Sequence, residues 1–274
     1  MTLKWINTIA YVLMVTVNAL ANLLPIGGNT TGQVSGAYPN LFTPAPYTFS
    51  IWGAIYLLMA VFVLYQWEVF DGGTYSAVVR SDVGLWFAIS CALNIGWIFL
   101  WHNKLIGLST AAIALLLVSL IVIQGRLNNA GGSFLQRMAA KSGFSLYYGW
   151  IIAATIANIS VWLTKLGWNG FGLSADFWMV TVALIGAVIA CAVIIFGKNR
   201  IAGFAVMWAY AGILVRHLSP AYYAGSHPYV IAAIVVGEAV MLTAILMPFA
   251  IRFLEKYTIT QRSEYFTVRK SRNR

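Results

Sequence analysis

The side chains that could do chemistry in this sequence are amides and aromatic rings at helical spacing within apolar runs. They are Trp52 and Tyr56 in one run, Asn94 and Trp97 in a second, and Trp150, Ala154 and Asn158 in a third. Neighbours in each group are three or four residues apart, so they would share one face of a helix. Three such faces would form a pocket with flat apolar walls and a few hydrogen-bonding groups, which suits a planar or polycyclic hydrophobic ligand. Aromatic stripes and membrane Asn residues are also typical of helix packing, so spacing alone leaves both interpretations open.

Other reactive groups form no catalytic or metal-binding pattern. Cys91 and Cys191 lie within apolar runs without metal-ligand spacing, which indicates two inert thiols. Glu238 lies inside the last apolar run, where a carboxylate is a candidate for proton transfer or for pairing with Arg216. We therefore expect no catalytic residue, no metal and no cofactor.

The runs that carry these residues have the composition of membrane helices. Of the 274 residues, 61% are hydrophobic and 9% are charged, whereas about a quarter of a soluble protein is charged. A spanning helix needs about 20 mostly apolar residues. Eight runs fit, the last of them short: Ile6–Leu24, Tyr47–Tyr65, Val83–Trp101, Leu105–Ile123, Phe144–Leu163, Phe177–Phe196, Tyr229–Ile251 and Ile201–Val215. The sequence predicts an all-α integral membrane protein with an eight-transmembrane helix bundle.

The distribution of Lys and Arg predicts the orientation. Fourteen of the 17 lie on the side that holds both chain ends, and three lie on the other: Lys104, Lys165 and Arg216. The positive-inside rule then places both termini in the cytoplasm, with the protein in the cell membrane. The formal net charge is +10, but the basic residues lie between the apolar runs and in one tail. This distribution argues against nucleic acid as a partner. Residues 1–21 also resemble a cleavable signal, and cleavage would leave seven helices.

The first loop, Pro25–Pro46, carries four prolines and no charged residue. Proline restricts its own backbone and that of the preceding residue, so the loop should follow a stiff, extended path. Such a loop could cap a cavity in the bundle. Trp101 and Trp162 lie near the ends of their runs, and we expect both in the interfacial aromatic belt.

Three segments resemble the TspO family, the tryptophan-rich sensory or translocator proteins. They are Phe42–Met59, Leu93–Phe99 and Trp150–Trp162. The first is similar to the family's proline pair followed by Trp-x-x-x-Tyr and Met. The second is similar to Leu-Asn-x-x-Trp, and the third to Trp-x-x-x-Ala-x-x-x-Asn-x-x-x-Trp. The resemblance covers about residues 1–168, the length of the family's five-helix bundle.

The resemblance implies a cavity under the first loop that binds porphyrins, sterol-like lipids or aromatic drugs, in a protein that commonly forms homodimers. The candidate ligand-binding residues are Phe42, Tyr47, Trp52, Tyr56, Asn94, Trp97, Trp150, Ala154 and Asn158. Two departures weaken an enzymatic role in porphyrin breakdown: Phe42 stands where the family has Trp, and Ala45 splits the proline pair.

These observations predict a TspO-like five-helix membrane domain (1–168), a three-helix membrane extension (169–251) and a basic cytoplasmic tail (252–274). The leading hypothesis is a membrane binding protein or carrier for a porphyrin, another tetrapyrrole or a sterol-like ligand, with the first loop as gate. The alternative is a sensor or accessory subunit, which would contact protein partners through the tail and through the small residues Gly186, Ala190, Ala205 and Ala209. A porphyrin-degrading enzyme and a proton-coupled transporter that uses Glu238 are less favoured.

Overall fold

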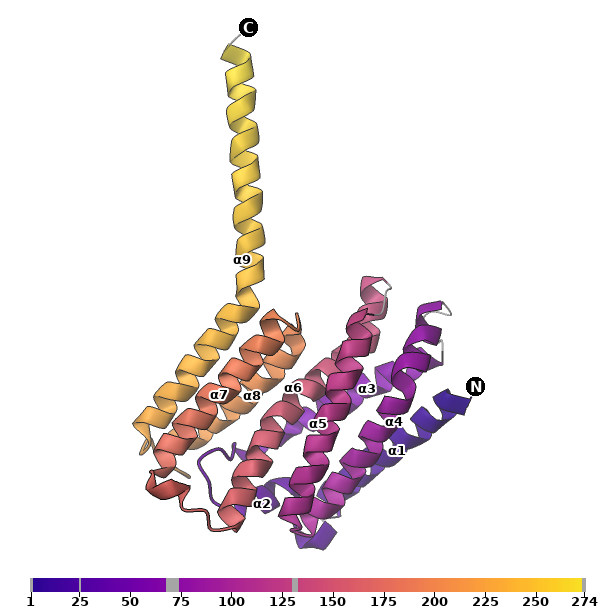
Figure 1. Cartoon of the computed structure of the whole chain (residues 1–274), viewed down its shortest axis with the longest axis vertical. Helices are drawn as coiled ribbons and strands as arrows, with labels where there is room; N and C mark the ends of the chain where they lie inside the picture. The colour runs from indigo at the N-terminus through magenta and orange to yellow at the C-terminus, as the bar shows by residue number, and fades with distance from the viewer. Residues whose placement is uncertain (1, 25, 68–73, 130–132, 273–274) are drawn as a thin grey trace.

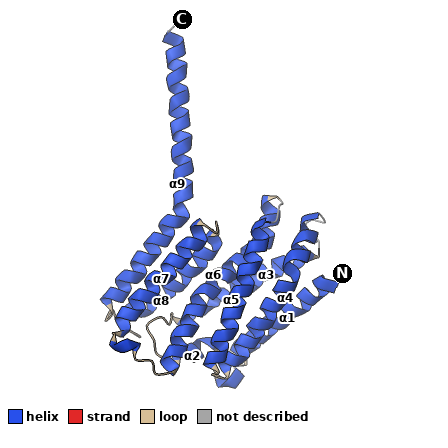
Figure 2. Cartoon of the chain, viewed as in Figure 1, coloured by secondary structure: helices blue, strands red, loops and turns tan. Residues whose placement is uncertain are grey.

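The computed structural model describes residues 2–24, 26–67, 74–129 and 133–272. These residues form helices, short 3-10 turns and loops, with no strand among them (Figure 2). The elements are α1 (Thr2–Leu23), η1 (Ile26–Gly28), α2 (Thr31–Gly36), η2 (Pro46–Ser50), α3 (Ile51–Gln66), α4 (Thr74–His102), α5 (Ile106–Asn129), α6 (Phe134–Lys165), η3 (Gly170–Gly172), α7 (Ala175–Ile195), α8 (Arg200–Leu218) and α9 (Pro228–Arg272). Eight of the described helices are long and apolar enough to cross a membrane, which confirms the predicted spans, the short one included.

The eight long helices lie side by side, and both chain ends lie at the same end of the bundle (Figure 1). The first loop lies at the opposite end. Within the bundle α4 packs against α1 and α5, and α6 packs against α3, α5 and α8. The cytoplasmic location of the termini stays a prediction. Arg80, Arg252 and the basic residues beyond 253 lie outside the described side chains.

Two buried apolar clusters form the core. The first joins α1 and α3–α6, and it includes Ala205 and Ala209 from α8. The second joins α7, α8 and α9, and it includes Phe42 of the first loop and Ile152 of α6. Each cluster therefore contains residues from both sides of residue 168.

Helices α6 and α8 approach closely because a glycine lies at their crossing. A Cβ on Gly149 would lie 2.7 Å from the backbone carbonyl carbon of Ala202, so no larger residue fits there without a shift of α8. The start of α8 is fixed by Asn199, whose side chain accepts a hydrogen bond from the Ala202 amide at 3.1 Å. Local capping and a small residue thus combine to place α8 against the first five spans.

The small residues expected to contact a protein partner are used inside this chain instead. Gly186 and Ala190 are buried in α7, and Ala205 and Ala209 are buried in α8. That part of the sensor hypothesis was wrong, because the helices of the bundle occupy these surfaces themselves. Helix α9 continues past the bundle to Arg272 and contains Pro248, the kind of residue that bends a helix. Figure 1 shows α9 changing direction where it leaves the bundle.

Candidate functional site

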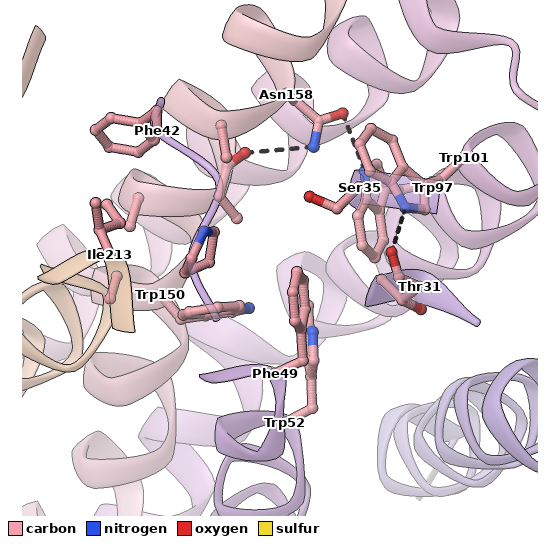
Figure 3. Close-up of a pocket in the computed structure, with 15 residues that line it drawn as sticks. Thr31, Ser35, Phe42, Phe49, Trp52, Trp97, Trp101, Trp150, Asn158 and Ile213 are labelled. Carbon is pink, nitrogen blue, oxygen red and sulfur yellow. Dashed lines mark hydrogen bonds between the residues drawn. The ribbon is translucent and has the colours of Figure 1, made fainter. Parts of the chain in front are cut away.

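An aromatic cavity lies beneath the first loop, where α3, α4, α6 and α8 meet (Figure 3). Its volume is about 30 Å³. The lining residues are Thr31, Ser35, Phe42, Pro44, Phe49, Trp52, Trp97, Trp101, Trp150, Ala153, Ala154, Ala157, Asn158, Ala209 and Ile213. A space of this size holds one or two water molecules, so an aromatic ligand would have to displace part of the wall.

Four tryptophans give the cavity its flat walls. The ring centroid of Trp52 lies 6.0 Å from that of Trp97 and 6.1 Å from that of Trp150. Trp97 is in turn stacked with Trp101 at 5.9 Å. On α6, Ala153, Ala154 and Ala157 leave the space that larger side chains would fill. Rings surrounding small residues make a slot suited to a flat apolar molecule.

Asn158 is the amide of the cavity wall, and its hydrogen bonds are made within the protein. Its Oδ1 accepts bonds from Trp97 Nε1 at 3.4 Å and from Ser109 Oγ at 3.2 Å. Its Nδ2 donates to the Ala154 carbonyl at 3.3 Å. Asn158 therefore holds α4, α5 and α6 together at the cavity, and it also orients the Trp97 indole.

Unlike the Asn158 amide, the indole N–H of Trp150 has no acceptor in the protein. The side chain is 3% exposed, and the buried Nε1 has no hydrogen-bond partner in the protein. Buried indole N–H groups usually have a partner. The cavity therefore offers one unused hydrogen-bond donor beside an otherwise apolar surface.

Trp101 lies in the cavity, so its assignment to the interfacial belt was wrong. It is 3% exposed, and its Nε1 donates to the Thr31 carbonyl at 3.1 Å. The next residue, His102, hydrogen-bonds Thr31 Oγ1 and the Ile26 carbonyl, each at 3.1 Å. The first loop folds back onto the end of α4 and buries a tryptophan that would otherwise face the interface. Trp162 is 39% exposed.

Three of the candidate ligand-binding residues do not line the cavity. Tyr47 is 44% exposed, and its ring packs edge-on against Trp208 of α8. Tyr56 lies behind Trp52 and stacks on it at 5.6 Å. The other six line the cavity: Phe42, Trp52, Trp97, Trp150, Ala154 and Asn158.

Asn94, the third residue outside the lining, is fully buried between helices. Its Oδ1 accepts a bond from Asn18 Nδ2 at 2.6 Å, and its Nδ2 donates to Tyr147 Oη at 2.8 Å. The side chain thus links α1, α4 and α6. This is the packing role that spacing alone left open.

Helix α8 and the α8–α9 loop fasten the second half of the first loop and the following turn, η2. Four backbone carbonyls accept hydrogen bonds from side chains of this region: Asn40 from Tyr223 Oη, Leu41 from His217 Nε2, Pro44 from Arg216 Nη1, and Thr48 from Trp208 Nε1. In addition, the Ala45 amide donates to the Gly212 carbonyl. The five distances lie between 2.8 and 3.4 Å. The described part of the extension thus holds the cap of the cavity in place.

The sequence matches the family described as TSPO-like protein over residues 4–247. This chain belongs to the TSPO-like family. Comparisons with curated proteins and with solved structures gave no match. The match continues well past residue 168, where the recognisable motifs end, so the last three helices belong to the region that the family shares.

Several residues that line the cavity of this TSPO-like protein were not predicted from the sequence. Thr31 and Ser35 come from the short helix α2, whose Thr30 cap and Gln33 form a capping box. Ala209 and Ile213 come from α8, four residues apart on one helix face. The capping-box pattern and the i, i+4 spacing were visible in the sequence, but neither reveals that the element faces the cavity. Among the described residues, no group of three or more His, Cys, Asp or Glu could hold a metal ion.

Proposed function

We propose that this TSPO-like protein binds or carries a hydrophobic planar ligand, of the porphyrin or sterol-like class, in the aromatic cavity beneath the first loop. The observation that carries the proposal is the buried indole N–H of Trp150, which has no acceptor in a wall of tryptophans. A flat ligand with a carbonyl, carboxylate or hydroxyl oxygen would stack on the rings and accept this bond. The described lining carries no charged side chain, so stacking and apolar contact supply most of the affinity.

The small volume of the cavity fits a carrier that closes around its ligand and is closed without it. Ligand pockets typically measure about 300–1,000 Å³, whereas this cavity measures about 30 Å³. Binding therefore requires movement of side chains in the wall. We expect the ligand to displace side chains that line the cavity, such as Phe42 of the first loop and Phe49 of η2.

A binding titration tests this proposal. Purified protein in phosphatidylcholine nanodiscs is titrated with protoporphyrin, and binding is followed by tryptophan quenching and by equilibrium dialysis. Trp150→Phe keeps an aromatic ring but removes the donor, so the dissociation constant should rise about 3- to 10-fold. Trp5→Phe is the matched control, because Trp5 is 56% exposed and packs on Trp67 away from the cavity.

A lack of saturable binding by protoporphyrin and by cholesterol would contradict the proposal, provided that the protein is helical and monodisperse. Saturable binding that Trp150→Phe leaves unchanged would place the ligand elsewhere on the protein.

The sensor hypothesis is supported by one feature of the described backbone. Helix α9 extends 21 residues beyond Ile251, the last residue of its membrane span, and projects from the bundle (Figure 1). A protein partner that copurifies in fixed ratio, and is lost on deletion of residues 252–274, would favour a sensor or accessory subunit. The homodimer that the family resemblance implies stays a prediction, which analytical ultracentrifugation in detergent checks.

A further inference from the structure

A second, larger cavity lies next to the aromatic cavity and has a volume of about 620 Å³. Its walls are the end of α6, the α6–α7 connection, the start of α7, residues 39–42 of the first loop, and Tyr223 from the α8–α9 loop. We call it the outer cavity. Leu173 is 49% exposed and Trp168 is 36% exposed, so the outer cavity opens to the surroundings. Its volume falls within the range of ligand pockets.

Phe42 separates the two cavities. Among the described residues, it is the one side chain that lines both of them. The Phe42 ring is 3% exposed and belongs to the cluster that joins α7, α8 and α9. Figure 3 shows it at the edge of the aromatic cavity, on the side away from Trp97 and Trp101. Rotation of this ring would therefore reshape the wall that the two cavities share.

The backbone around Phe42 is fixed, so its side chain is the part able to move. The Phe42 amide donates to Asn40 Oδ1 at 3.1 Å. On either side, the Leu41 carbonyl accepts a bond from His217 Nε2 at 2.9 Å, and the Ala45 amide donates to Gly212. Rotation of the ring into the outer cavity leaves these bonds intact, because none of them involves the side chain.

The lining of the outer cavity suits the same class of ligand. Trp168 and Trp178 lie at its wall with ring centroids 4.9 Å apart, and Tyr223 adds a third aromatic ring. The described residues that line it include no charged side chain. A flat apolar molecule could therefore rest there before it reaches the inner tryptophans.

We infer that the outer cavity is a vestibule where the hydrophobic planar ligand binds first, and that Phe42 is the gate through which the ligand passes to the aromatic cavity. The inference rests on the proposed function. It gives α7 and the α6–α7 connection a specific role, since they build the part of the vestibule that a five-helix bundle lacks.

Stopped-flow quenching of tryptophan by protoporphyrin, in phosphatidylcholine nanodiscs, tests the vestibule and the gate. Phe42→Ala should raise both the association and the dissociation rate at least tenfold, because an open gate speeds passage in both directions. Thr164→Phe narrows the vestibule from the end of α6 and should slow association at least threefold, with little change in equilibrium affinity. Ile159→Phe is the matched control: Ile159 is a 42% exposed residue of α6 that lines neither cavity.

The outcomes separate the gate from the proposed function. If Phe42→Ala raises the dissociation rate alone, Phe42 is a binding contact and the gate is refuted. If Thr164→Phe behaves like Ile159→Phe, the ligand does not pass through the vestibule. In both cases intact equilibrium binding would leave the aromatic cavity as the site. An absence of saturable equilibrium binding by both protoporphyrin and cholesterol would overturn both proposals.

Discussion

The contact between Gly212 and Thr48 offers the sharpest test of how α8 holds the cap of the cavity. Thr48 is fully buried in η2, directly after the first loop, and its hydroxyl and Cβ face the backbone of α8 at Gly212. A Cβ added at Gly212 would lie 2.8 Å from Thr48 Cγ2 and 2.9 Å from Thr48 Cβ, with Oγ1 closer still. Rotation about χ1 of the threonine cannot relieve this clash, because it leaves Cβ in place and keeps either Oγ1 or Cγ2 against α8. In Gly212→Ala the backbone of the loop must therefore move away from α8.

The size of the effect follows from the distances. Ordinary contact begins at 3.4 Å, so Thr48 Cβ must move by at least about 0.5 Å. The shift strains the bond from the Ala45 amide to the Gly212 carbonyl and the bond from Trp208 Nε1 to the Thr48 carbonyl. Overpacking of a tight interior typically costs about 1–3 kcal/mol. For a chain of this size that corresponds to a fall in melting temperature of about 2–10 °C.

Thermal unfolding in detergent, followed by circular dichroism, measures the loss. Gly125→Ala is the control, because Gly125 is exposed on α5 and a Cβ there meets nothing within 4 Å. Thr48→Ala removes two of the three clashing atoms, so the Gly212→Ala/Thr48→Ala protein should recover part of the stability lost in Gly212→Ala. Independent sites would instead give additive losses. Additive losses, or a Gly212→Ala protein as stable as Gly125→Ala, would refute the reasoning.

Three further perturbations test other parts of the structure. Asn94→Ala should lower the free energy of unfolding by about 0.5–2 kcal/mol in thermal unfolding and leave protoporphyrin affinity unchanged. A loss of affinity at normal stability would instead indicate that Asn94 contacts the ligand. Trp208→Phe removes the donor to the Thr48 carbonyl and should speed amide hydrogen exchange in the first loop, but not in α5. Gly149→Ala forces α8 away from α6 at Ala202; it should expose the α6–α7 and α7–α8 connections to limited proteolysis, and an unchanged digestion pattern would contradict this packing.

The sequence predicted the spans because their physical requirement is local. A run of about 20 apolar residues suffices to identify a membrane helix, and the shorter run Ile201–Val215 became α8. Three short motifs identified the first five spans as similar to the TspO family. The last three spans lack such motifs, so their membership could not be recognised from the sequence, although the family match includes them.

The contacts of individual side chains were harder to predict, because helical spacing defines a helix face but not the neighbouring element that covers it. Asn94 and Asn158 have the same type and similar surroundings in sequence, yet Asn158 lines the cavity and Asn94 bridges three helices. Tyr47 turns outward because Trp208, 161 residues further along, is there to pack against it. Trp101 is buried because Thr31 folds back over it. Each of these positions depends on a long-range contact that the spacing of residues along the sequence does not reveal.

The same long-range contacts decide how the cavity can open. The first loop was expected to act as a gate, and a loop that swings away together with η2 must break the five hydrogen bonds to α8 and the α8–α9 loop. At about 0.5–1.5 kcal/mol each, and if their contributions add, these bonds oppose opening by about 2.5–7.5 kcal/mol. The open form would then make up roughly one molecule in a hundred to fewer than one in a hundred thousand. Rotation of the Phe42 ring breaks none of these bonds, so the fastening of the loop does not oppose a side-chain gate. Weakening the fastening, as in Trp208→Phe, should therefore change ligand association much less than Phe42→Ala does.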